Sequence, residues 1–206
     1  RTFKGADPVT LAELSFLLNT LAIKGSGEFA QKLLSVYVLN KENKTSGIGP
    51  GIYYFDPYKN ALHMVHDGYD LAGAFNGNEA LYDSAGFAIV LAGSNNQAEE
   101  NASALYLSGY LGQSLMNVST QANIGFCAVG TVDQNIFREA LQLGKEGIVM
   151  HTFLGGRISP EQIEAIELPA DPGIHKQDPA DLIKEYLSER IPRYMIPSYF
   201  VFLDSI

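Results

Sequence analysis

The sequence predicts an α+β domain built around a mainly antiparallel sheet. Two short apolar runs, at residues 51–55 and 62–66, flank a turn-forming segment and indicate a β-hairpin. A long amphipathic helix lies in the middle of the chain, and strand-like runs on either side alternate with helices. Hairpins together with a long mid-chain helix favour this class over a doubly wound parallel sheet.

Composition fits one substantial globular core. The chain has 206 residues, of which 46% are hydrophobic and 18% are charged. A net charge of −9 disfavours binding to nucleic acid or to an anionic membrane surface. A single cysteine forms no internal disulfide, and no apolar run approaches the length of a membrane span, so we expect a cytoplasmic protein. The abrupt start at Arg1 suggests an excised piece of a longer chain.

The first half of the chain predicts one helix and a set of strands. Thr10 and Glu13 form a capping box in front of a helix over residues 11–22, and Gly25 ends it. Strands are expected at residues 33–39 and 86–92, on either side of the hairpin and of one or two short helices within residues 69–84.

The central helix is predicted from an apolar stripe at steps of three and four. A neighbouring row holds Gly109 and Gly112, which indicates close approach of another helix or a flat ligand, or else tight core packing. The stripe consists of Ala104, Leu107, Leu111, Leu115, Val118 and Ala122.

A glycine-bounded apolar run, residues 124–130, follows this helix and predicts a buried strand or extended loop. Asp133 opens the next helix, so small residues precede a helix start where backbone N–H groups are free. Such a loop suits a planar, electron-rich ligand. Residues 148–154 form the next predicted strand, which ends in Gly155, Gly156 and Arg157.

The last part of the chain differs in composition from the body. Four prolines in residues 159–180 indicate a linker or wrapping arm. A short amphipathic helix at residues 181–187 and a strand at 198–203 follow, too few to form a core alone. The expected domains are therefore 1–158, the arm 159–180 and a terminal fragment 181–206.

The sequence contains few residue patterns that indicate a catalytic or metal-binding site. His63 and His66 stand three apart on a strand and therefore face opposite sides, which disfavours a shared metal. His151 fits a satisfied core histidine better than a catalyst, and Cys127 fits a buried structural thiol better than a reactive one. The sequence contains no Walker loop, GxGxxG or GxSxG motif. We therefore assign no catalytic residue and no metal.

Two stretches carry a family resemblance. Residues 187–204, LSERIPRYMIPSYFVFLD, resemble the small C-terminal subdomain of a nonribosomal peptide synthetase adenylation domain. The preceding body, with GIYYFDP, GYLGQSLM, GFCAVG and HTFLGG, resembles flavin-dependent oxidase domains of the nitroreductase-like superfamily. Such oxidases are inserted into adenylation domains in thiazole-forming and indigoidine synthetases.

The resemblance implies an FMN-binding homodimer formed through the central helices. It matches Arg1 to the arginine that pairs with the FMN phosphate, and the loop 128–131 to the segment against the isoalloxazine ring. Residues 155–157 match the strand end near the ribityl phosphate; for Arg157, ligand contact and simple surface charge remain alternatives. The implied cofactor-binding residues are Arg1, Gly125, Cys127, Ala128, Val129, Gly130, Thr131, Gly155, Gly156 and Arg157.

The chain also departs from that family. EFAQKLLSVYVL stands where the family has a serine- and glycine-containing flavin motif, and an acidic residue common in the central helix is replaced near Leu107. Tyr106 and Tyr110 lie near the expected site as packing residues or bases.

The residues and the resemblance therefore leave three alternative functions. The first is an FMN-dependent oxidase that acts on a thiazoline, oxazoline or aminoacyl intermediate tethered to a peptidyl carrier protein, with dioxygen as final acceptor. Its further partner would be the adenylation domain of the same synthetase. The second is a catalytically silent dimerisation or interaction module, which the missing flavin motif favours. The third is a nicotinamide-dependent nitroreductase, which the adenylation-like tail disfavours.

Overall fold

The computed structural model describes residues 3–4, 7–27, 32–69, 71–94, 98–166 and 187. The chain divides into two units, Arg1–Ile163 and Glu164–Ile206. Apart from the end of one helix and Leu187, every described residue belongs to the first unit. The rest of the predicted arm and of the adenylation-like fragment, including the predicted terminal strand, lies outside the described residues.

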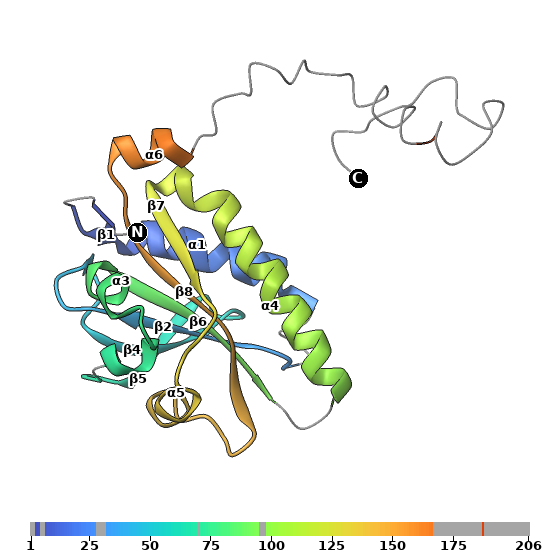
Figure 1. Ribbon diagram of the computed structural model, residues 1–206. Coiled ribbons are helices and arrows are strands. Elements are labelled where there is room, and N and C mark those ends of the chain that lie inside the picture. Colours follow the sequence, from blue (N-terminus) through green and yellow to red (C-terminus); the bar gives the residue numbers. More distant parts are fainter. Residues whose placement is uncertain are drawn as a thin grey trace. The chain divides into compact units, whose positions relative to one another are not determined.

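A six-stranded antiparallel sheet forms the centre of the first unit, in the order β5-β4-β2-β6-β8-β7 (Figure 1). This arrangement confirms the predicted α+β class and the hairpin. The hairpin turn is held by Asp56, whose Oδ1 accepts the N–H groups of Tyr58 and Lys59. The strands are β2 Ser35–Asn40, β4 Gly51–Asp56, β5 Ala61–His66, β6 Phe87–Ser94, β7 Ile124–Val129 and β8 Gly147–Arg157, with a separate parallel pair, β1 Val9–Thr10 and β3 Thr45–Ser46.

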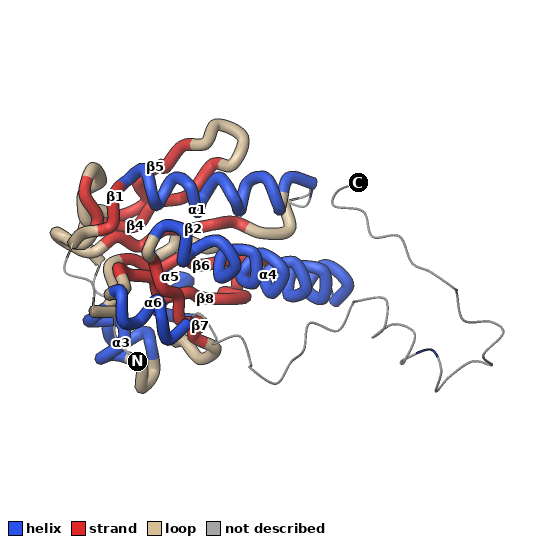
Figure 2. Tube along the Cα trace, turned by 90° about the horizontal axis from the view of Figure 1, so that it is seen from above, coloured by secondary structure: helices blue, strands red, loops and turns tan. Residues whose placement is uncertain are grey.

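Helices cover both faces of this sheet. One core lies between the sheet and the neighbouring helices α1 and α4 (Figure 2). A second core lies on the opposite face, under η1, α3 and α5. The helices are α1 Leu11–Lys24, η1 Ala72–Phe75, α3 Glu79–Ser84, α4 Ala98–Ser119, η2 Thr120–Ala122, α5 Gln134–Ala140 and α6 Pro160–Ile166.

Helix α1 begins with the predicted capping box. The Thr10 hydroxyl accepts the Glu13 N–H at 3.2 Å, and the Glu13 carboxylate accepts the Thr10 N–H at 2.8 Å. Two of the donors that a helix start leaves open are thereby satisfied. Gly25 caps the other end, as expected.

Helix α4 confirms the predicted stripe. Ala104, Leu107, Leu111 and Leu115 are all at most 4% exposed and belong to the core on this face, while Val118 and Ala122 pack against it partly buried. The helix begins at Ala98, six residues before Ala104, the first residue of the stripe.

The two glycines of α4 have different surroundings. A Cβ on Gly112 would overlap the ring of Phe153 in β8, whereas a Cβ on Gly109 would meet nothing within 4 Å. Gly112 therefore allows close packing of α4 on its own sheet. The prediction that another helix approaches this row is wrong at Gly112, and tight core packing is correct.

Strand β8 ends in Gly155, Gly156 and Arg157 as predicted, and these residues pair with β7. Helix α5 ends at Ala140, and Gln142 beyond it adopts a left-handed φ of 52°. Residues 160–166, expected to be arm, form α6 with Pro160 at its first position. None of the described helices is long and apolar enough to cross a membrane.

Candidate functional site

Strands β7 and β8 bring most of the predicted cofactor-binding residues together. They pair antiparallel, with Gly125 opposite Gly156, Phe126 opposite Gly155 and Val129 opposite Thr152. Strand β7 is the last in the sheet order, so no described strand pairs with its outer edge. The predicted residues thus form one ladder at an open edge of the sheet.

The three glycines of this ladder make room for aromatic and aliphatic side chains. A Cβ on Gly156 would lie 2.8 Å from Cγ of Phe3, and one on Gly125 would lie 2.5 Å from Cγ2 of Ile158. A Cβ on Gly155 would lie 2.6 Å from Cζ of Phe87. Within the described chain, their immediate role is packing.

Phe3 anchors the N-terminal segment on this ladder. Its ring lies over Gly156 and contacts the position above Gly125, and its N–H donates to Oγ of Ser84 at 3.4 Å. The N–H of Lys4 donates to Oε1 of Gln162 in α6 at 3.0 Å. Arg1, the predicted phosphate partner, lies outside the described residues, two positions before this anchor.

Ala128 and Val129 are the last two residues of β7, and Gly130 and Thr131 begin the connection to α5; we call these four residues the loop 128–131. Ala128, Gly130 and Thr131 are exposed, whereas Val129 is buried in the core under α5. A Cβ on Gly130 would meet nothing within 4 Å. Asp133 then caps α5 by accepting the N–H groups of Asn135 and Ile136, and its own N–H donates to Ala74 at 2.8 Å. Anchored at both ends, the loop presents small residues to a ligand.

Cys127 differs from the sequence expectation. Its side chain is half-buried instead of buried, and Sγ lies 3.8 Å from the carbonyl oxygen of Ala128. The reason is its position on the edge strand, which sequence neighbours alone do not reveal.

Arg157, at the end of β8, is engaged by the chain itself. Its Nη1 and Nη2 donate to the two carboxylate oxygens of Glu13 at 2.9 and 2.6 Å, and also to the carbonyls of Ala122 and Pro8. These bonds lower the pKa of Glu13 to about 2. The remaining guanidinium donor, Nε, is buried without a hydrogen-bond partner in the described chain. The guanidinium is thus committed to α1 in this structure.

His151 lies on β8 close to the open loop. It is half-buried, its ring centroid lies 4.2 Å from that of Phe153 with the ring planes tilted by 38°, and its Nδ1 accepts the Thr152 N–H at 3.1 Å. Burial lowers the pKa of this imidazole. Sequence reasoning treated His151 as a core residue because its neighbours are apolar; its pairing with the loop strand is the signal that was missed.

The outer surface of α1 and α4 carries exposed apolar side chains, which we call the α1/α4 face. The exposed fraction is 79% for Tyr106 and 64% for Ile23. Lys24 of α1 and Tyr106 and Tyr110 of α4 line a cavity of about 770 Å³ at this face. The other exposed apolar residues of the α1/α4 face are Phe16, Leu105 and Tyr110.

The described residues suit one end of a flavin better than the other. The small, open loop 128–131 can lie flat against a planar ring, since neither Ala128 nor Gly130 projects a large side chain. At the other end of the ladder the guanidinium of Arg157 is paired with Glu13, so a phosphate there would depend on Arg1. No group of three or more described His, Cys, Asp and Glu residues is arranged to hold a metal ion.

Comparison with known proteins places this fold. No protein-family model matches the chain. Indigoidine synthase from Streptomyces lavendulae is 28% identical over 211 residues, which cover 97% of this chain. The chain spans only 16% of the length of that synthase.

Solved structures share the architecture. A nitroreductase-like protein from Anabaena variabilis matches 77% of this chain and 36% of its own, with a TM-score of 0.63 and 21% identity. The Escherichia coli microcin synthetase McbBCD matches 77% of this chain and 67% of its own, with a TM-score of 0.65 and 16% identity. An oxidoreductase containing FMN matches 82% of this chain and 80% of its own, with a TM-score of 0.54 and 15% identity. The domain therefore has the nitroreductase-like fold.

Proposed function

We propose that this domain is an FMN-dependent oxidase of a nonribosomal peptide synthetase. The observation that carries the proposal is the open loop 128–131, at the free edge of a nitroreductase-like sheet. Likeness to indigoidine synthase along 97% of the chain supports the link to a synthetase. We propose that the isoalloxazine ring of FMN lies against the loop 128–131 and that Arg1 binds its phosphate.

The substrate in this proposal is a thiazoline, oxazoline or aminoacyl intermediate tethered to a peptidyl carrier protein. FMN, when bound, accepts a hydride and passes the electrons to dioxygen. The chain would orient the ring against the loop 128–131. Residues 181–206 would belong to the adenylation domain that hosts the oxidase, with the residues after α6, 167–180, as the connecting arm, in the cytoplasm.

The proposal includes a homodimer formed through the α1/α4 face. Leu105, Tyr106 and Tyr110 are at least 45% exposed on one helix, and Phe16 and Ile23 are exposed on the neighbouring one. Exposed apolar surface of this kind, in contact with a cavity, is typical of association sites. A second copy would cover it and would close the solvent side of α4.

A catalytically silent interaction module is the second candidate. The engagement of Arg157 by Glu13 favours it, because the guanidinium is then withdrawn from a phosphate. No feature of the described residues specifically supports a nicotinamide-dependent nitroreductase. That alternative is distinguished from the oxidase by the flavin reduction experiment.

Flavin content is the first test of the oxidase. Purified protein should show visible flavin absorbance, or should bind added FMN noncovalently. Anaerobic mixing with a carrier-bound thiazoline or aminoacyl substrate should then bleach the flavin, and oxygen should restore it with release of peroxide. Protein that takes up no FMN would leave the silent module. Flavin bleached by a nicotinamide donor but by no carrier-bound substrate would establish the reductase.

A further inference from the structure

We propose that the Nε2–H group of His151 donates a hydrogen bond to the ligand held against residues 128–131. The inference rests on the proposed function, in which that ligand is the flavin ring. It assigns a ligand contact to a polar side chain that the sequence analysis places in the core.

The pairing of β7 with β8 places His151 beside the loop. Val129 is opposite Thr152, the last pair of the ladder, so His151 is level with Gly130. Ala128 is opposite Phe153, and directly opposed residues of antiparallel strands project from the same face. Because the rings of His151 and Phe153 are in contact, with their centroids 4.2 Å apart, His151 shares that face with exposed Ala128.

Helix α4 borders the same space. A Cβ on Gly93 would lie 2.8 Å from the methyl carbon of Met150 and 3.4 Å from Cβ of Ala104, and Gly112 packs on Phe153 further along the helix. His151 shares the face of β8 that carries Phe153, so it lies on the α4 side of the sheet. A Cβ on Gly109 of α4 would meet nothing within 4 Å. The His151 side chain is partly exposed.

The hydrogen bonding of the imidazole determines whether His151 is a donor or an acceptor toward a ligand. Nδ1 accepts the Thr152 N–H, so the neutral imidazole carries its proton on Nε2. No described residue pairs with Nε2. Burial lowers the pKa of His151 and so favours this neutral form at physiological pH. His151 is therefore a hydrogen-bond donor toward the ligand, and not the base that removes the substrate proton.

A donor held by backbone and ring contacts is pre-oriented. Nδ1 is fixed by the backbone and one face of the ring by Phe153, so only a small part of the bond's energy is lost to ordering the side chain. A hydrogen bond to an electron-accepting ring stabilises the negative charge that develops on its reduction. His151 thereby makes reduction of the bound flavin more favourable.

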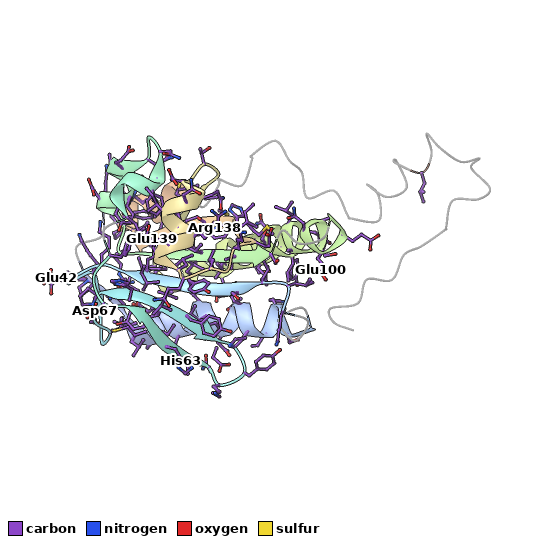
Figure 3. The ribbon with its side chains drawn as sticks, turned by 90° about the horizontal axis from the view of Figure 1, so that it is seen from below. Glu42, His63, Asp67, Glu100, Arg138 and Glu139 are labelled. Carbon is purple, nitrogen blue, oxygen red and sulfur yellow. The ribbon has the colours of Figure 1, made fainter. Side chains whose placement is uncertain are left out.

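The test compares His151→Phe, which keeps an aromatic ring but removes the donor, with His151→Gln, which restores an N–H donor. His63→Gln is the matched histidine control, since His63 lies on β5, at the other end of the sheet order, and points away from the molecule (Figure 3). The readouts are the dissociation constant for FMN, the position of the visible flavin band and the flavin reduction potential. Thermal unfolding verifies that each variant is folded.

We expect His151→Phe to weaken FMN binding about 3- to 10-fold, as loss of one hydrogen bond predicts. The flavin band should move, the potential should fall, and His151→Gln should recover most of each change. A folded His151→Phe protein with the affinity, band and potential of the wild type would overturn the role of His151 while leaving FMN binding intact. Wild-type protein that binds no FMN would overturn both this inference and the oxidase.

Discussion

Arg157 and Glu13, 144 positions apart in the sequence, form a two-pronged ion pair with N–O distances of 2.9 and 2.6 Å. The pair ties the first turn of α1 to the last residue of β8. Glu13 simultaneously completes the capping box through Thr10, so one carboxylate serves the helix start and the sheet end together.

The ion pair should make stability depend on pH in the acidic range. The folded-state pKa of Glu13 is about 2, below the ordinary value of 4.5, so its stabilising effect is complete above about pH 4.5. It is lost as the pH falls from there toward 2. Urea unfolding at several pH values should show this loss, and Glu13→Gln, less stable by about 1.5–3 kcal/mol at pH 7, should flatten the profile. An equal pH dependence in Glu13→Gln would contradict the assignment.

The two glycines of α4 should respond oppositely to alanine. Gly112→Ala forces a methyl group into the ring of Phe153 and should lower the free energy of unfolding by about 1–3 kcal/mol. Gly109→Ala meets open space and should raise it by up to about 1 kcal/mol, since alanine favours the helix. Chemical denaturation measures both. Similar effects of the two substitutions would show that α4 does not pack on β8 as described.

The proposed dimer should depend on Tyr106. Tyr106→Glu places a charge on the α1/α4 face at a side chain that is 79% exposed, so the fold should survive while association weakens. Tyr58→Glu is the control, because Tyr58 is 69% exposed but lies on the hairpin turn. Sedimentation should detect a shift toward monomer with Tyr106→Glu alone. A wild-type protein that is monomeric with FMN bound would remove the homodimer from the proposal.

The anchor of the N-terminal segment should matter for FMN binding. Phe3→Ala removes the ring that lies over Gly156, so Arg1 would be held less firmly near the phosphate. We expect weaker FMN binding, by about 3- to 30-fold, because a less firmly held Arg1 would lose part of its charged hydrogen bonding to the phosphate. Phe16→Ala, at a side chain 42% exposed on α1, is the matched control for FMN binding. Unchanged affinity in Phe3→Ala would indicate that the phosphate is held elsewhere.

The sequence predicts features that depend on local spacing. The capping box, the hairpin and the stripe from Ala104 to Leu115 each involve residues within a few positions, and all three are present. The packing partners of Gly112, Gly156 and Arg157 are Phe153, Phe3 and Glu13, which lie far away in the chain. Because no periodicity relates such distant residues, sequence alone left open whether these positions serve a ligand or the core.

The candidate site shows the same division. The loop 128–131 was visible as small residues before a helix cap, and the structure exposes it. His151 was assigned to the core because its neighbours on β8 are apolar, and only the pairing of that strand with β7 places it beside the loop. The predicted burial of Cys127 is wrong for a related reason. Cys127 lies on β7, the edge strand, whose side chains are less covered than those of a central strand.

The hydrogen bond from Lys4 to Gln162 brings the two ends of the folded body side by side, and Figure 1 shows the start of the chain next to α6. A body whose entry and exit points are adjacent interrupts a host loop without forcing its two halves apart. In the proposed synthetase, the rest of the chain would therefore connect to this domain through two adjacent points, which the Lys4–Gln162 hydrogen bond holds together.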